Sequence, residues 1–472
     1  MDILSLFQSF VNHFEGFLTD SISFHELELK IADSTNELNL DVLGNIIESI
    51  DLEYKNSKER KASWTVQETR PRSLITSLGV IYFNKTYYHS KVRKNNGKFD
   101  YYSYVEDYLG ITSWTKMTLG AETKLINNAL DNGMTWAAEN TIPGYITTRQ
   151  TISTKIKNIN YNMVVDTPET KEVIETLYIE ADEVHANLQK KTKNKKEKKK
   201  NKIVPVILAH EGHKEDFVKK KELKNTHYLA SSILKTEKLW NEMYNYLDKR
   251  YDLDKVKYLF ISGDGASWIK QFCEAFPNAI YVLDKFHYRK ALNYIFKRHS
   301  IYTDLADYYL RKNMIDEFKI LVNFQIKNHP HQKDYMKKHM IYLINNIQGI
   351  INQKHPNYKC PASMEGHISN KYARFITSRP HAYSNDGLEN IVQLLTLKAN
   401  NIYLTEELYH QFKYGESTYK NLNLEKFISN FRLQANAIYN NTKKYLDNYQ
   451  VNNHEFRSED NYRLDFFLNK RL

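Results

Sequence analysis

Cysteine is nearly absent from the sequence, and proline and glycine are scarce. The 472 residues include 2 cysteines, 9 prolines and 15 glycines. The two cysteines, Cys273 and Cys360, lie far apart, which excludes a disulfide-rich scaffold and a cysteine-based zinc finger and fits a reducing compartment. The shortage of proline and glycine excludes collagen-like chains and proline-rich linkers.

Long hydrophobic runs are also missing. No apolar stretch of the sequence approaches the roughly 20 residues of a membrane-spanning helix, and its start lacks the basic segment of a secretory signal peptide. We therefore expect a cytoplasmic protein without a membrane partner. Aromatic residues, at 13%, are plentiful. They exclude global disorder and allow several cores to form in a chain of this length.

Positive charge outweighs negative charge along the chain. There are 67 lysines and arginines against 56 acidic residues, a formal net charge of +11. This balance favours a polyanionic partner such as nucleic acid. The densest basic run, at 190–202, predicts a loop that contacts DNA phosphates without reading sequence. A solvated loop with no binding role is the alternative.

The first third of the chain mixes helical and strand-like patterns. Apolar residues at three- and four-residue spacing predict a helix within 1–55, and the polar stretch 54–69 predicts a linker. The β-rich stretches 73–78 and 80–88, around Gly79, predict a hairpin.

Three helical segments after Thr115 suggest a helix-turn-helix. Pro143-Gly144 breaks the chain, and Thr147 or Thr148 can cap a third helix with isoleucines on one face. The polar side of that helix would contact DNA bases. The residues we assign to this contact are Arg149, Gln150, Ser153 and Lys157. Helical clusters that bind nothing share this pattern, which leaves both interpretations open.

Five strand-like segments follow, interleaved with helices. They span 177–182, 202–212, 226–232, 256–265 and 279–284. The first three have short connections typical of an antiparallel meander, whereas the last two need crossovers and so pair in parallel. We predict an α/β fold (α+β overall) with a mixed five-stranded sheet, an order found in ribonuclease-H-like folds and not unique to them. Residues 302–352 predict two long amphipathic helices inserted into this domain.

Two aspartates stand at predicted strand ends. Asp182 and Asp264 would lie on parallel neighbours about 4.8 Å apart, at the carboxyl edge of the sheet. Paired carboxylates repel each other unless a cation lies between them, and Mg²⁺ or Mn²⁺ suits carboxylate oxygens. Two such ions can support phosphodiester chemistry. An aspartate at a strand end can instead be a plain turn or helix cap.

A third carboxylate and a histidine extend this candidate site. Glu365 opens a helical segment after the insertion, and Glu389 on the following helix is a rival. His287 lies three residues after Asp284, on a basic first helical turn. Glu365 could also be a helix-dipole partner, and His287 could be a structural histidine.

Seven short motifs occur in the order found in one known family. They are SLGVIYFNKTYY at 77–88, EADEVH at 180–185, HEG at 210–212, SGDGASWI at 262–269, VLDKFH at 282–287, SMEGH at 363–367 and SRP at 378–380. Over residues 70–390 the chain resembles the ISLre-two insertion-sequence transposases. Through Asp284 and His287 it is also similar to the Mutator-like transposases, which carry a helical insertion before the last acidic residue.

The resemblance implies a bacterial, nucleoid-associated DDE transposase with a ribonuclease-H-like core. Asp182, Asp264 and Glu365 fall on the family's catalytic and metal-binding triad, and Asp284 with His287 on its accessory motif. The implied cofactor is Mg²⁺ or Mn²⁺, as two ions, and the implied partner is double-stranded DNA bound by a homo-oligomer. A nuclease of the same fold without strand transfer and a catalytically inactive DNA-binding remnant are the alternatives.

These patterns together predict five regions. They are an N-terminal helical region (1–68), a hairpin and helix-turn-helix DNA-binding region (69–165), a catalytic core (166–300), a helical insertion (301–358), and the completion of the core with C-terminal helices (359–472).

Overall fold

The computed structural model describes residues 23–157, 170–189, 201–214, 222–274, 276, 278–296, 300–377 and 383–415. The chain divides into two compact units, of which unit 1 contains the described residues up to Lys116 and unit 2 those from Met117 onward. Several expectations lie outside the described residues: the apolar helical stripe before residue 23, the lysine run at 190–200 and the part of the predicted C-terminal helices that follows residue 415.

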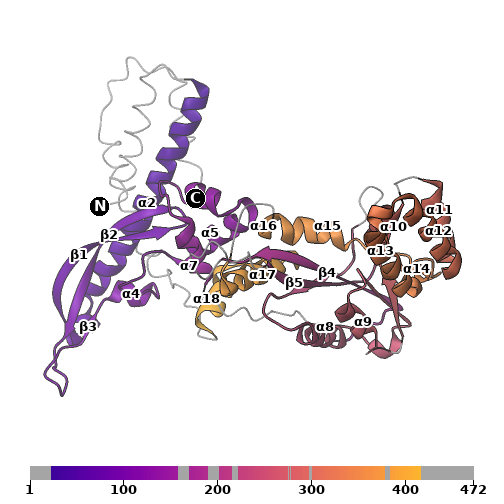
Figure 1. Cartoon of the computed structure of the whole chain (residues 1–472). Helices are drawn as coiled ribbons and strands as arrows, with labels where there is room; N and C mark the ends of the chain where they lie inside the picture. Colours follow the sequence, from indigo (N-terminus) through magenta and orange to yellow (C-terminus); the bar gives the residue numbers. More distant parts are fainter. Residues whose placement is uncertain are drawn as a thin grey trace, which may run out of the picture. The chain divides into compact units, whose positions relative to one another are not determined.

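Unit 1 is built on a long antiparallel hairpin and a long helix (Figure 1). Ser23 and Glu26 form a capping box that starts the helix, because each side chain satisfies the backbone N–H of the other residue. One face of this helix packs against the second hairpin strand. The elements are α2 (Phe24–Asn56), α3 (Lys58–Ser63), β1 (Trp64–Thr76), β2 (Gly79–Ser90), β3 (Tyr101–Tyr102) and α4 (Tyr104–Tyr108).

The hairpin is confirmed, but the linker predicted at 54–69 is wrong. These residues form the end of α2, all of α3 and the first residues of β1. They resemble a linker in composition because β1 exposes every second side chain here and α3 buries none. A strand with one solvated face is polar in composition although its backbone is fully paired.

Unit 2 begins with three short helices that match the predicted helix-turn-helix segments. They are α5 (Leu119–Asn132), α6 (Met134–Asn140) and α7 (Arg149–Ile156). Thr148 caps α7 by accepting a hydrogen bond from the Thr151 N–H. Ile152 and Ile156 are buried. The four residues assigned to DNA keep solvent-accessible surface, and Arg149 and Gln150 are the exposed ones.

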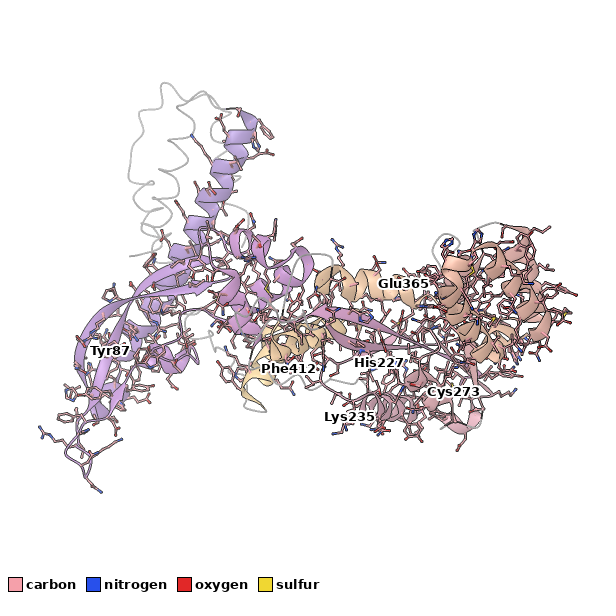
Figure 2. The ribbon with its side chains drawn as sticks, viewed as in Figure 1. Tyr87, His227, Lys235, Cys273, Glu365 and Phe412 are labelled. Carbon is pink, nitrogen blue, oxygen red and sulfur yellow. The ribbon has the colours of Figure 1, made fainter. Side chains whose placement is uncertain are left out.

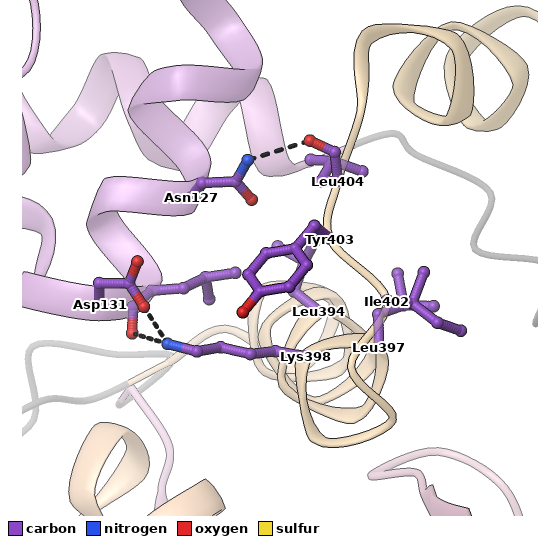
Figure 3. Close-up of a pocket in the computed structure, with 9 residues that line it drawn as sticks. Asn127, Asp131, Leu394, Leu397, Lys398, Ile402, Tyr403 and Leu404 are labelled. Atoms are coloured by element: carbon purple, nitrogen blue, oxygen red, sulfur yellow. Dashed lines mark hydrogen bonds and ion pairs between the residues drawn. The ribbon is translucent and has the colours of Figure 1, made fainter.

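The three helices are fixed to the C-terminal helices α17 (Asn385–Ala399) and α18 (Glu406–Tyr414). Figure 3 shows part of this contact: the Asn127 amide donates to the Leu404 carbonyl at 3.0 Å, and Asp131 pairs with Lys398. The nearby carboxylate of Glu122 is buried and bonds Lys155, Tyr409 and Lys413. The candidate DNA-binding helices are therefore part of the same packed body as α17 and α18.

The sheet of unit 2 has the predicted five strands and the predicted pairing. Its order is β6-β5-β4-β7-β8. The β4–β5 and β5–β6 pairs are antiparallel, whereas β4–β7 and β7–β8 are parallel. The strands are β4 (Thr176–Asn187), β5 (Asn201–His210), β6 (His227–Ala230), β7 (Tyr258–Gly263) and β8 (Ala279–Leu283).

The two faces of this sheet carry different residues. On one face, apolar side chains such as Ile179 and Ile261 pack against α8 (Thr236–Arg250) and α9 (Ser267–Glu274), with the 3-10 turn η1 (Leu253–Lys255) following α8. Because side chains alternate along a strand, Tyr178, Glu180 and Asp182 belong to the opposite face. That face is covered by the segment that follows the helical insertion and by α15 (Met364–Ile368).

The insertion packs beside β8. The prediction that it consists of two long helices is wrong. Breaks at Asn313, which has a φ of 58°, at Pro330 and at Asn346 divide it into four helices and a 3-10 turn. Leu305 is exposed, whereas Ala306 is buried. The insertion follows α10 (Lys285–Ile295) and consists of α11 (Ile301–Arg311), α12 (Ile315–Asn328), η2 (Pro330–Gln332), α13 (Lys333–Asn345) and α14 (Ile347–Asn352).

After α15 the chain continues through a π-helical turn, η3 (Ser369–Ala373), and the short helix α16 (Arg374–Ile376). Among the described residues, none of the helices is both long and apolar enough to cross a membrane.

Candidate active site

Asp182 and Asp264 lie at the edge of the sheet where the parallel pairing stops. The prediction that Asp182 closes its strand is wrong, because β4 continues to Asn187 through its pairing with β5. The parallel pairing of β4 with β7 ends at Glu180 opposite Ser262. Both aspartates lie two residues beyond this last pair, so the expected meeting of the two strand ends is retained.

The turn that carries Asp264 is held from two sides. A Cβ on Gly263 would lie 2.9 Å from the Ala181 carbonyl oxygen, so only glycine lets β4 and β7 approach this closely. Gly265 has a φ of 92°, and a Cβ there would clash with Asn346. The Tyr342 hydroxyl of α13 donates to the Asp264 carbonyl at 2.6 Å. The inserted helices therefore support the turn that positions Asp264.

Three side chains from distant parts of the chain converge at this edge. Asp182, His287 and Glu365 each place one ligand atom within 4.8 Å of the others, and the described residues contain no other such group. His287 Nε2 lies 3.6 Å from Asp182 Oδ2. Glu365 is exposed on α15, as Figure 2 shows. Asp264 is not a member of this group.

The first turn of α10 brings His287 to Asp182. Asp284 caps this helix by accepting from the Phe286 N–H at 2.6 Å, and its own N–H donates to the Gly263 carbonyl. Burial raises the pKa of Asp284 to about 6, and the negative charges of Glu180 and Asp182 add to this effect. Burial alone would lower the pKa of His287, but the neighbouring carboxylates, Asp264 among them, raise it. The accessory pair is thus part of the same electrostatic site.

A buried hydrogen-bonded pair, formed by Glu180 two residues before Asp182 and by His210, fixes the start of α15. Glu180 Oε1 lies 3.1 Å from His210 Nε2, and Glu180 Oε2 accepts from the Ser363 N–H at 2.8 Å. His210 Nδ1 accepts from the Gly212 N–H, which leaves the ring proton on Nε2 facing Glu180. Sequence reasoning missed this pair, although Glu180 shares a strand face with Asp182 and His210 opens one of the seven motifs.

Glu389 lies in a different environment. Its carboxylate accepts hydrogen bonds from the Ser231 hydroxyl and from the N–H and hydroxyl of Ser232, just beyond β6. Gln393, one turn further along α17, donates to it as well. The structure therefore brings Glu365 to Asp182, whereas Glu389 is engaged in local contacts.

One protein family matches most of this chain. The match covers residues 17–411, which include β4 with its flanking elements, the helical insertion and α15. The chain belongs to the UPF0236 family. This family is described as an uncharacterised protein family, so membership assigns no activity.

Several UPF0236 proteins of Caldanaerobacter subterraneus subsp. tengcongensis are similar over nearly the whole chain. One is 29% identical over 399 residues, which span 84% of this chain and 82% of that protein, and its name joins eleven numbered labels. A second is 28% identical over 84% of this chain and 83% of its own length. A third, also 28% identical, has a name that joins four labels.

Proposed function

We propose that this UPF0236 chain is a DDE transposase of a bacterial insertion sequence, with a ribonuclease-H-like core. It would bind the terminal inverted repeats of its element, cleave DNA at each end and join the freed ends to target DNA. The observation that supports this most is the convergence of Asp182, His287 and Glu365 at the edge of the five-stranded sheet.

The order of the elements supports the same proposal. The first carboxylate lies on the central strand β4, the second follows the parallel neighbour β7, and the third arrives on α15 after a helical insertion. This is the order in which an acidic triad is assembled in the transposases that the sequence resembles. Asp284 and His287 lie against Asp182, where an accessory pair could act.

The names of the relatives add independent support. We interpret the eleven labels joined in one name, and the four in another, as multiple copies of one gene in a single genome. Dispersed copies of nearly identical genes are what an active insertion sequence leaves behind, whereas an ordinary metabolic enzyme gives no reason for them.

The donor set fits divalent cations. Asp182, Glu365 and Asp264 are carboxylates that no lysine or arginine among the described residues pairs with. Mg²⁺ or Mn²⁺, as two ions, would be held by Asp182 and Glu365, which converge in the structure, together with Asp264 two residues beyond the last pair of the neighbouring strand. Bound cations would neutralise the carboxylates, polarise the phosphate and favour ionisation of the attacking water.

The protein side chains would position the reactants. Asp182 and Glu365 face the same space, where they can orient a water in line with the scissile phosphorus while the bond to the 3′-oxygen breaks. The freed 3′-hydroxyl would then attack a phosphorus of target DNA and displace a second 3′-oxygen. His287 Nε2 can donate a hydrogen bond to a phosphate oxygen, because no described residue lies within hydrogen-bonding distance of it. Positioning and charge neutralisation carry most of such phosphoryl transfers.

The test is an end-cleavage and strand-transfer assay. The purified chain is incubated with Mg²⁺ or Mn²⁺, a supercoiled plasmid, and a duplex that carries the inverted repeats flanking its gene. We expect nicks at the repeat ends and joined products, both absent with Asp182→Asn. Cleavage without joining would identify the alternative nuclease, and binding without cleavage would identify an inactive remnant.

A further inference from the structure

A cavity of about 880 Å³ opens beside α15, on the side of the sheet edge formed by β6. Its walls come from β6, from α8 and from the α15–η3 segment that carries Glu365. The lining residues used below are Tyr228, Arg250, His367 and Lys371, with Lys214 and Glu222 at its outer part. Its volume is that of a ligand site for a molecule of nucleotide size.

The described residues of the cavity lining carry more positive than negative charge. Among them, the positive groups are Lys214, Arg250 and Lys371, and the carboxylate is that of Glu222. Lys214 pairs with Glu222, and Arg250 pairs with Glu172 outside the lining. No described carboxylate pairs with Lys371, which instead donates to the Ala399 carbonyl at 3.3 Å and lies 4.9 Å from the centre of the Tyr228 ring. An incompletely compensated ammonium group at the wall of an open cavity attracts an anion.

The surroundings of Lys371 make this attraction stronger than at an ordinary surface lysine. Burial lowers the pKa of Lys371, and the neighbouring charge of Lys398 lowers it further. An anion bound beside the ammonium would relieve both penalties. His367 adds a second polar group, because the Tyr228 hydroxyl lies 2.7 Å from its Nδ1 and so leaves Nε2 for another partner.

Helix geometry links this cavity to the candidate active site. Lys371 follows Glu365 by six residues on the continuous helical segment formed by α15 and η3. The cavity wall and the candidate third carboxylate therefore belong to one short segment of the chain. A DNA strand held at Glu365 can continue past this segment and place another of its phosphates at Lys371.

We propose that this cavity holds the DNA strand close to the scissile phosphate, with Lys371 and His367 contacting one backbone phosphate. The inference rests on the proposed function, because it takes DNA as the ligand. Its contact is with the backbone and so carries no sequence preference.

The test measures binding, so that it does not depend on cleavage. In an Asp182→Asn background without divalent cations, affinity for a fluorescent end duplex is measured over a range of salt concentrations. The logarithm of the affinity falls as the logarithm of the salt concentration rises. We expect Lys371→Gln to make this slope less steep by about 0.9, the value for a single phosphate neutralised by one cation. Lys371→Arg should keep the slope. Lys238→Gln, an exposed lysine on α8, is the matched control and should also keep it.

Neutral methylphosphonate linkages locate the phosphate. When such linkages are placed singly along each strand, one of them close to the repeat end should weaken binding by the Asp182→Asn protein and have no added effect once Lys371→Gln is also present. Additive losses at every position, or an unchanged slope for Lys371→Gln, would overturn the inference. If the Asp182→Asn protein shows this pattern but the wild-type chain never cleaves DNA, the proposed phosphate contact in the cavity is supported and the transposase proposal is wrong.

Discussion

Asp182 and Glu389 are equally buried, each with 9% of its surface exposed, yet their surroundings are opposite. Glu389 accepts hydrogen bonds from Ser231, Ser232 and Gln393. Asp182 accepts one at 2.8 Å, from the N–H of its own neighbour Glu183, and otherwise faces His287 at 3.6 Å and the exposed Glu365. A carboxylate surrounded by donors stabilises the fold, whereas one that faces another carboxylate is stabilised by a cation beside it.

The same contrast appears elsewhere in unit 2. Glu122 is as closely surrounded as Glu389, by Lys155, Tyr409 and Lys413, and it joins the three-helix cluster to α18. Burial by itself therefore does not mark a functional acid. The number of donors directed at its oxygens separates the two kinds, and the predictions below rely on this difference.

The largest effect should come from removing the incompletely satisfied carboxylate. Asp182→Asn should reduce cleavage and strand transfer on the order of 10³-fold or more, because a neutral amide cannot hold the cation that neutralises the phosphate. Binding to the repeat ends should persist, since it is assigned to α7. Mg²⁺ or Mn²⁺ should support the wild-type reaction, and Ca²⁺ should support it poorly because its looser shell misplaces the reacting oxygens.

Asp264→Ala and Glu365→Ala should be inactive in the same assay, with Glu389→Gln as the matched control for a buried acid. Full activity of Asp264→Ala would contradict the metal-carboxylate site. Full activity of Glu365→Ala, together with an inactive but folded Glu389→Gln, would transfer the third position to Glu389.

We expect the reverse order for the free energy of unfolding: replacing Glu389 should lower it more than replacing Glu365. Glu389→Ala leaves the donors of Ser231 and Ser232 without their acceptor, and we expect it to lower the free energy of unfolding by about 3 kcal/mol. Glu365→Ala removes an exposed acid beside Asp182 and should leave the unfolding free energy unchanged or slightly higher. Urea unfolding of both variants, followed by circular dichroism, measures the difference. Equal losses in the two would show that donor number does not separate them.

The sheet could be predicted from the sequence because its strands are apolar runs of the right length, three in succession and two separated by helices. The ends of elements were harder to predict. The prediction ends the strand at Asp182, although β4 gains five further residues by pairing with the next strand, β5, whose register the composition does not reveal. Breaks in the insertion depend on Asn313 and Asn346, residues that also occur inside helices, so composition did not reveal them.

The candidate site was predictable residue by residue but not as an arrangement. Asp182, Glu365 and His287 were each identified from motifs, and the structure brings these three together. The pair formed by Glu180 and His210 was not predicted. Its structural role is to hold the start of α15 through the Ser363 N–H, and no sequence pattern reveals a contact with a backbone group. Lys371 was not predicted either, because only its surroundings in the fold distinguish it: no carboxylate among the described residues pairs with it.

A buried group without a partner should make the fold acid-sensitive. His227 stacks on Tyr246, its Nε2 has no hydrogen-bond partner among the described residues, and burial, with Arg250 nearby, lowers its pKa from 6.5 to about 4. Between pH 6.5 and pH 4, His227 is therefore protonated in the unfolded chain but stays neutral in the folded chain. Its contribution to stability is present above pH 6.5 and is lost as the pH falls toward 4, by up to about 3 kcal/mol.

His227→Phe keeps the stacking on Tyr246 and should remove this part of the stability loss between pH 7 and pH 4.5. The measurement is the free energy of unfolding in urea at the two pH values. His331→Phe, at an exposed position, is the control and should keep the wild-type pH dependence. A pH dependence that is the same in His227→Phe and in the wild-type chain would show that other groups cause the acid sensitivity.

The smallest effect on the free energy of unfolding should come from polar side chains that are exposed to solvent. Arg149 and Gln150 are exposed on the first turn of α7, while Ile152 and Ile156 anchor that helix. Replacing both polar residues by alanine should leave the unfolding free energy unchanged and weaken binding to the repeat ends by about 1–3 kcal/mol for each base that is no longer recognised. Competition between the end duplex and random DNA measures this, because a base-reading role predicts a loss specific to the ends. An equal loss on both DNAs would leave these residues a charge role only, and no loss on either would remove α7 from the DNA interface.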